Sequence, residues 1–219
     1  MDLESYKNTY EEGDAPGWKA IDQILAQLYP NREPDAYFRP ILPAVAGGGE
    51  PLDGISLYRS FSGDSDHLHY ISYGFSELYY NEEGFGQEFS KFGFELTFRL
   101  KPFKDDAEFP GWPSSLMQNL AKYVFQTGNY FDDYHSIPTN SPIRLESDTE
   151  LRAIVFVTDS QLGEIDTVHG KVKFLQMVGI TQREFDLIKD GKLDRLELVE
   201  KLKENNPLLI TDLERKSIV

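Results

Sequence analysis

The nine residues from Phe92 to Leu100, FGFELTFRL, decide the fold class of this chain. Apolar side chains at positions 92, 94, 96, 98 and 100 alternate with Gly93, Glu95, Thr97 and Arg99. A period of two places the two sets on opposite faces of a β-strand, one face buried and the other polar. A slip by one residue would expose three phenylalanines, so we expect a well-fixed register in an antiparallel or mixed sheet.

Four helices are predicted on either side of this strand. Residues 17–29 carry apolar side chains at i, i+3, i+4 and i+7, which is the spacing of one helical face. A wide apolar stripe beginning after Trp112 predicts a second helix, and two further apolar patterns follow near the C-terminus. The residues expected to cap or end these helices are Ser115, Gln118 and Gly128 for the second, Thr181 and Glu184 for the third, and Gly191 between the third and fourth.

The remaining apolar runs predict short strands separated by turn residues. We expect residues 129–150 to be an irregular polar loop. Strands and helices are interspersed without strict βαβ alternation, which indicates an α+β fold: a mixed, mostly antiparallel sheet with helices packed on it, in a single domain. Residues 1–14 are expected to be an N-terminal tail, and residues 15–219 the domain. The other predicted strands are residues 38–45, 55–61, 69–75, 153–157, 172–178 and 208–210.

Composition limits the function classes. The 219 residues include 22 Lys and Arg against 37 Asp and Glu, a net charge of −15, so the chain repels nucleic acid and attracts a basic protein. Eight acids and two bases fall between Asp132 and Asp166, which concentrates a charge of −6 there. With no cysteine, no apolar run of membrane-spanning length and no signal peptide, we expect a soluble cytoplasmic protein that does not bind membranes.

Two clusters suggest chemistry, and each has a simpler structural interpretation. His67 and His69 share one face of a predicted strand, a geometry that can bind zinc, but a structural role is favoured. Asp132 and Asp133 beside His135 have the groups for acid–base catalysis, but a solvated loop explains them better. We therefore predict no metal, no cofactor and no enzymatic activity, with a hydrolase as the least favoured alternative.

Several of these segments resemble the Suppressor of fused family. Residues 69–79 (HYISYGFSELY) are similar to its HYISxGxSxLY run, and residues 92–100 are similar to its GFGFELTFRL strand. Residues 112–126 (WPSSLMQNLAKYVFQ) resemble its WPxxLMQxLARYVFQ helix. Shorter matches are residues 51–53, 174–180 and 209–212, and order and spacing agree from about residue 15 to the C-terminus.

The resemblance implies a protein-binding module with no chemistry of its own. It covers the N-terminal domain of the animal protein, whose second domain helps to clamp a Gli-type transcription factor. Short single-domain members are typical of bacteria, where the family is predicted to supply immunity proteins against secreted toxins. In the animal protein a Gly-Asp-His-x-Ser-Trp stretch lies near the peptide-binding cleft. Here that region reads DDYHSIP over residues 132–138, which argues against a Gli-type ligand.

The resulting hypothesis is a module that binds a basic partner, either a secreted toxin or, as the alternative, an endogenous factor that it sequesters. The partner would be steered by charge to the acidic loop, with tyrosines fixing its register and the sheet edge accepting an extended peptide. Tyr123 is a candidate because of its position in the helix that resembles the family's. The other candidate residues are chosen because they lie in the acidic loop. The candidate partner-binding residues are Tyr123, Tyr130, Asp132, Asp133, Tyr134 and His135.

Overall fold

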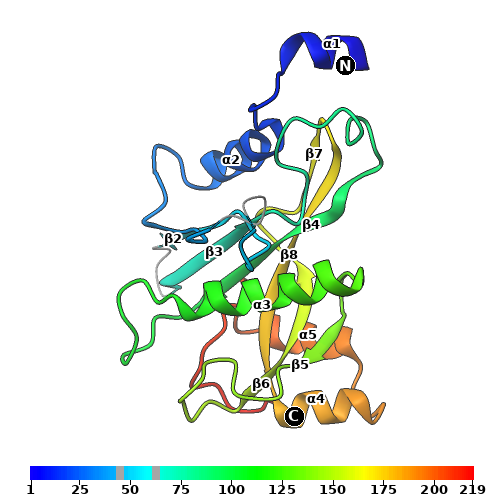
Figure 1. Cartoon of the computed structure of the whole chain (residues 1–219). Helices are drawn as coiled ribbons and strands as arrows, with labels where there is room; N and C mark the ends of the chain where they lie inside the picture. The colour runs from blue at the N-terminus through cyan, green and yellow to red at the C-terminus, as the bar shows by residue number, and fades with distance from the viewer. Residues whose placement is uncertain (43–46, 61–64) are drawn as a thin grey trace.

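The computed structural model describes residues 1–42, 47–60 and 65–219, and it shows one twisted mixed sheet with helices on both faces (Figure 1). The strand order is β1-β2-β3-β4-β8-β6-β5, and β7 also pairs with β8. The predicted α+β class is confirmed. The strands are β1 (Ala36–Phe38), β2 (Gly54–Ser60), β3 (His67–Tyr73), β4 (Phe89–Leu100), β5 (Ser136–Pro138), β6 (Leu151–Thr158), β7 (Glu164–Thr167) and β8 (Gly170–Thr181). The helices are α1 (Leu3–Thr9), α2 (Pro16–Leu28), α3 (Trp112–Thr127), α4 (Gln182–Lys189) and α5 (Arg195–Lys203).

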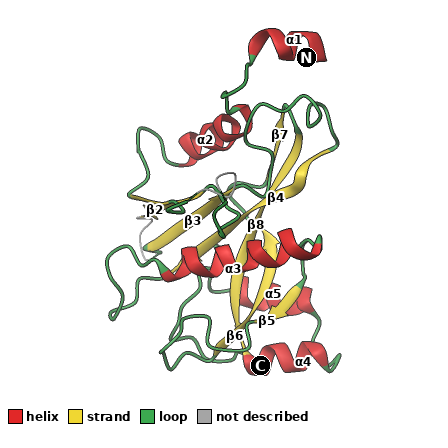
Figure 2. Ribbon diagram, in the orientation of Figure 1, coloured by secondary structure: helices red, strands yellow, loops and turns green. Residues whose placement is uncertain are grey.

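All strand pairs are antiparallel except β4 with β8, which run parallel at the centre of the sheet. Helix α3 crosses one face of the sheet (Figure 2). Its buried residues Met117 and Val124 pack in the same core as Leu96 and Phe98 of β4. Helix α2 packs against Tyr58, Ile71 and Phe174 in a second core. Helices α4 and α5 pack on Ala153, Val155 and Val157 of β6, while the alternate residues Ile154 and Phe156 join the α3 core.

The polar face of β4 is buried as well as the apolar face. Glu95, Thr97 and Arg99 have no exposed surface, which the alternating pattern alone did not reveal. Arg99 Nη2 donates to both oxygens of the Asp159 carboxylate at 3.0 Å, and Thr97 Oγ1 donates to Asp159 Oδ2 at 3.0 Å. Arg99 and Asp159 thus compensate each other's buried charge, and Thr97 adds a hydrogen bond to the carboxylate. An apolar environment would not tolerate either charge unpaired.

Two histidines complete this buried cluster. His69 Nε2 lies 3.3 Å from Asp159 Oδ2, and Tyr29 at the end of α2 forms a 2.8 Å hydrogen bond with His69 Nδ1. His67 Nε2 lies 2.9 Å from Arg99 Nη1, so His67 accepts there and its Nδ1–H donates to the Ser65 carbonyl at 2.6 Å. The arrangement supports the structural interpretation of His67 and His69. We call Tyr29, His67, His69, Arg99 and Asp159 the buried polar cluster.

Glu95 fixes the chain that follows β3. Its carboxylate accepts hydrogen bonds from the backbone N–H groups of Gly74 and Ser76, both at 2.9 Å, and from the hydroxyls of Ser72 and Ser76, both at 2.6 Å. Gly74 adopts φ = 134°, a conformation that L side chains rarely adopt, where a Cβ would lie 3.2 Å from the Asp53 nitrogen. The loop is therefore held by one buried acid.

The expected tail, residues 1–14, contains α1, whose Tyr6 is fully buried. The Tyr6 hydroxyl accepts a hydrogen bond from the Asn81 backbone N–H at 3.0 Å. It lies 2.8 Å from His169 Nε2, to which it donates, and His169 Nδ1–H in turn faces the Glu77 carbonyl at 3.1 Å. The N-terminal helix is thereby tied to the β7–β8 turn.

Many of the local predictions are confirmed, and four are wrong. The capping box of Thr181 and Glu184 is present, and Gly128 ends α3 in a left-handed conformation. The capping box expected from Ser115 and Gln118 is wrong, because Gln118 is buried and bonds both the N–H and the carbonyl of Leu52. Residues 208–210 form no strand, and β5 lies within the expected loop. Of the predicted strand 38–45, residues 39–42 form no strand because β1 ends at Phe38, and residues 43–45 lie outside the described residues, as does residue 61 of the predicted strand 55–61.

No helix in the described part of the chain is long and apolar enough to cross a membrane.

The buried histidines predict a loss of stability in mild acid. Burial lowers the pKa of His67 and His169, and lowers the pKa of His69 from 6.5 to about 4. The unfolded chain takes up these protons near pH 6.5 and the folded chain does not, so the free energy of unfolding falls as pH drops from 6.5 toward 4. At 1.36 kcal/mol per pKa unit, His69 alone accounts for about 3 kcal/mol of this loss.

Urea unfolding between pH 8 and pH 4 measures this effect. The variant His69→Gln should show a shallower dependence on pH than the unmodified chain, whatever its stability at pH 8. His135→Gln, at an exposed position, is the matched control and should leave the slope unchanged. A slope unaffected by His69→Gln would contradict the assignment.

Candidate functional site

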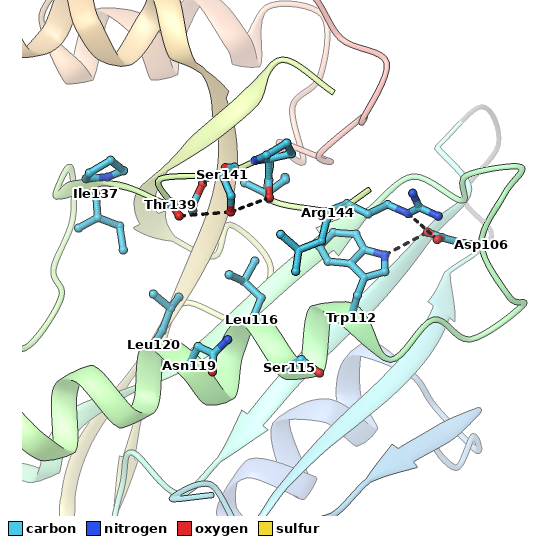
Figure 3. Close-up of a pocket in the computed structure, with 14 residues that line it drawn as sticks. Asp106, Trp112, Ser115, Leu116, Asn119, Leu120, Ile137, Thr139, Ser141 and Arg144 are labelled. Atoms are coloured by element: carbon cyan, nitrogen blue, oxygen red, sulfur yellow. Dashed lines mark hydrogen bonds and ion pairs between the residues drawn. The ribbon is translucent and has the colours of Figure 1, made fainter. Parts of the chain in front are cut away.

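A groove runs between α3 and residues 137–145 and encloses a cavity of about 560 Å³ (Figure 3). Leu116 and Leu120 on α3 form one wall, and Ile137, Pro142 and Ile143 face them. An apolar cavity of this size is typical of a ligand or peptide site. We call it the α3 groove.

One end of the α3 groove is held rigid by charged and aromatic groups. Arg144 Nε donates to Asp106 Oδ1 at 2.7 Å, and Trp112 Nε1 donates to Asp106 Oδ2 at 3.1 Å (Figure 3). The Arg144 guanidinium also lies over the Phe103 ring, 5.1 Å from its centroid. The side chain of Asp106 is only 5% exposed, so this ion pair fixes residues 142–145 against the start of α3.

Strand β5 borders the groove and lies at one end of the described sheet. It pairs with β6, Ser136 opposite Val155 and Pro138 opposite Ala153. The His135 carbonyl accepts a hydrogen bond from the Phe156 N–H, and the Thr139 N–H donates one to the Arg152 carbonyl. The main-chain groups of the residues between them point alternately toward β6 and away from it. The N–H of Ser136 and the carbonyls of Ser136 and Pro138 therefore point away from β6. This edge has main-chain groups available for another strand.

A second cavity, of about 290 Å³, brings together four of the predicted site residues. Tyr123 at the end of α3, and Tyr130, Tyr134 and His135 from the following loop, line it with Arg195 of α5. The three tyrosines are 44%, 62% and 37% exposed, respectively. We call this the tyrosine cavity. Ile137 lines both it and the α3 groove, so the two form one continuous surface.

The tyrosine cavity rests on stacked rings. Phe131 stacks on Phe156 with centroids 4.3 Å apart, and Tyr123 stacks on Phe131 at 6.0 Å. Tyr134 adopts φ = 61°, which is uncommon for a residue with a side chain. Arg195 Nε donates to Ser136 Oγ at 3.0 Å and thereby joins α5 to β5. The Tyr123 ring is thus supported by the stacked rings of Phe131 and Phe156.

Asp132 and Asp133 do not join this cavity. Both carboxylates bond Lys173 of β8, at 2.7 and 3.0 Å, and Asp133 also accepts from the N–H and hydroxyl of Thr158. Burial alone would raise the pKa of Asp132, but the Lys173 ammonium outweighs it and the pKa is lowered. Other acids of the 132–166 segment also form ion pairs with bases outside it: Glu150 with Lys216, Asp159 with Arg99, and Glu164 with Lys171. Much of the local charge is therefore compensated within the fold.

The alternative chemistries find little support in the geometry. His135 Nδ1 accepts from the Asp132 backbone N–H at 3.2 Å, whereas the carboxylates of Asp132 and Asp133 bond Lys173. The ring nitrogens of His67 and His69 face Arg99, Asp159, Tyr29 and Ser65. Among the described residues, no group of three or more His, Asp or Glu is arranged to hold a metal ion.

Sequence reasoning missed the α3 groove. The wide apolar stripe on α3 was the signal that could have revealed it. A helix that packs only one face on a sheet needs fewer apolar positions than this stripe contains. Met117, Ala121 and Val124 fill the core, and Leu116 at the margin remains partly exposed in the groove. The residues of the opposite wall carry no recognisable pattern, since they lie in irregular chain.

Comparisons with known proteins agree over most of the chain. A family model described as Suppressor of fused protein (SUFU) matches residues 48–216. Suppressor of fused homologs of Homo sapiens and Mus musculus are each 36% identical over 213 residues, which is 91% of this chain and 43% of theirs. The chain therefore spans less than half the length of these curated relatives.

Solved structures agree as well. A chain from the Sufu-Fu complex has a TM-score of 0.83 at 31% identity and covers 93% of both chains. Drosophila Suppressor of Fused has a TM-score of 0.82 at 32% identity, over 94% of this chain and 52% of its own. A SUFU homolog from Neisseria gonorrhoeae, at 16% identity and a TM-score of 0.61, covers 93% of this chain and 97% of its own and shares the fold.

The Lys173 contacts predict a specific change in ionisation. Lys173→Met should raise the pKa of Asp132, because the charged hydrogen bond that favours the carboxylate is lost. A carboxyl-carbon NMR titration measures this pKa. Lys171→Met, which removes a neighbouring lysine bonded to Glu164, should leave the Asp132 titration nearly unchanged. An unaltered Asp132 titration in Lys173→Met would show that other groups hold the loop.

Proposed function

The chain belongs to the Suppressor of fused family, and we propose that it is a non-enzymatic module that binds an extended segment of a protein partner along the α3 groove and the tyrosine cavity. The observation that carries this proposal is the outer edge of β5, with which none of the described strands pairs, beside an apolar groove. Such an edge supplies main-chain hydrogen bonds to an added strand, and adjacent cavities select its side chains.

The residues along this surface suit a protein ligand. Exposed tyrosines offer large rings with a polar tip, and they are enriched at the energetic centres of protein interfaces. Tyr123 stacks on Phe131, which in turn stacks on Phe156, so little conformational entropy is lost at Tyr123 when a partner docks. His135 and Arg195 add hydrogen-bonding groups at the rim.

The net charge of −15 supports a basic partner, and it opposes binding to nucleic acid. The effect arises from the whole surface, because Asp132 and Asp133 are already paired with Lys173.

We propose a secreted toxin as the partner, with the module acting as its immunity protein in the cytoplasm. The alternative is an endogenous factor held in a complex, which the relative solved as the Sufu-Fu complex supports. A toxin gene directly beside the gene for this chain would favour the first role.

Selection of peptides from a displayed random library tests the binding mode. We expect selected peptides to bind in the micromolar range and to lose about tenfold in affinity to Ser136→Pro, which removes an edge N–H. Ser136→Ala is the matched control: it loses the same Arg195 contact but keeps the N–H, and should bind nearly as well as the unmodified chain. Equal binding by both variants would exclude pairing to this edge.

Charge steering makes a separate prediction. Selected peptides should be enriched in Lys and Arg, and their association rate should fall as NaCl rises from 50 to 500 mM. Asp132→Asn with Asp133→Asn should reduce this rate only modestly, because it removes two of the 37 acids that produce the net charge of −15. Stopped-flow fluorescence measures the rate, and salt-independent association would show that charge does not guide the encounter.

A further inference from the structure

A third cavity lies beside the stretch where the pairing of β4 with β8 shifts register. Its volume is about 350 Å³, and five aromatic rings line it together with Lys91, Gly93, Asp132, Glu164 and Lys173. We call it the Phe89 pocket. The aromatic residues are Phe89, Phe92, Phe94, Tyr130 and Phe131.

An irregularity in the central strand forms this pocket. Between Phe89 and Phe94 the chain of β4 advances five residues while β8 advances only from Lys171 to Lys173, so three residues bulge out of the pairing. Lys91 has φ = 54° and Gly93 has φ = 79°. A left-handed conformation at a lysine costs about 1 kcal/mol or more, and bulges of this kind are frequent beside functional sites.

The bulge leaves aromatic surface in water. Phe89 is 52% exposed, and Tyr130, which also lines the pocket, is 62% exposed. Neither ring fills the cavity, although closing it would bury apolar area worth roughly 25 cal/mol per Å². The fold therefore maintains both an unfavourable backbone and an open aromatic pocket at the same place.

The charges around the pocket indicate what it can accept. Lys173 pairs with Asp132 and Asp133, and Glu164 pairs with Lys171 at 3.0 Å. The Lys91 ammonium donates to the Gly74 carbonyl at 2.8 Å and lies 4.6 Å from the Phe125 ring centroid. The two lysines and the two acids of the lining balance, so the lining favours neither a cationic nor an anionic ligand. An uncharged aromatic group needs no net charge in the lining and stacks on the rings.

The Phe89 pocket is continuous with the proposed binding surface. Tyr130 and Phe131 line both it and the tyrosine cavity, so a segment crossing that cavity extends directly into the pocket. We propose that the Phe89 pocket is a specificity site that receives one uncharged aromatic side chain, a tryptophan or a tyrosine, of the protein partner. This assignment of a partner side chain rests on the function proposed above.

N-acetyl-tryptophanamide, an uncharged tryptophan mimic, is the probe for the pocket itself. Titrated into ¹⁵N-labelled protein, it should shift the backbone amides of residues 89–94, 131–132 and 173 with millimolar affinity. Phe89→Ala should weaken this binding at least fivefold. Tyr79→Ala, which removes an aromatic ring that is 43% exposed elsewhere, is the control and should bind the probe normally. Tyr130→Ala provides a second variant in the pocket lining, and N-acetyl-lysinamide should cause no shifts in this set.

The outcomes separate the pocket from the proposed function. If no selected peptide binds the β5 edge, the binding mode is wrong, whereas a probe that fails to shift these amides overturns the pocket alone. Binding of N-acetyl-lysinamide equal to that of the tryptophan mimic would also overturn it. Concentration-dependent dimers in sedimentation, lost in Phe89→Ala, would assign the pocket to a second copy of this chain and overturn the partner assignment.

A partner side chain in the Phe89 pocket also predicts a feature of the selected peptides. They should carry an aromatic residue whose replacement by alanine lowers affinity about tenfold for the unmodified chain and little for Phe89→Ala. Isothermal calorimetry on the four combinations measures this coupling. Additive losses would show that the aromatic residue binds elsewhere and would overturn the assignment.

Discussion

The buried contact between Arg99 and Asp159 is the constraint on which the architecture depends. Neither charge tolerates an apolar environment alone, so the end of β6 and the C-terminal end of β4 must meet wherever the rest of the chain packs. Two histidines of β3 and a tyrosine from the end of α2 close around the same pair. One polar contact thereby aligns three strands and a helix, while the apolar cores only require that those elements be covered.

Sequence patterns predicted the elements with strong local signals. The alternation over residues 92–100 and the stripe after Trp112 identify β4 and α3, and the capping box at Thr181 marks the start of α4. The role of the polar face of β4 was not predictable in this way. The partner of Arg99 lies sixty positions away, after a strand that is apolar from Ala153 to Val157 and gives no sign of the pairing. Short strands such as β5 and β7 form because a neighbouring strand pairs with them, and their own residues show little preference.

In the candidate surface, too, some features follow from local sequence and others from long-range pairing. Tyr123, Tyr130, Tyr134 and His135 were chosen from one helix end and one loop, and the fold does place them around one cavity. Asp132 and Asp133 belong to the same loop but turn toward Lys173, because an alternative partner was available on β8. The α3 groove needed the meeting of α3 with residues 137–145, which only the tertiary structure specifies. Local sequence therefore indicated residue types, while long-range pairing decided which of them share a surface.

The parallel pairing of β4 with β8 has a consequence for how the chain is made. Strand β4 is complete at residue 100, yet its partner spans Gly170–Thr181, near the end of the chain. During synthesis, the first half leaves the ribosome with one long edge of β4 unpaired, and that edge carries a phenylalanine-rich strand. Native closure of the sheet must wait until residues 170–181 have been translated. Contacts of such long sequence separation make folding slow, so the unpaired edge of β4 is exposed to aggregation during this interval.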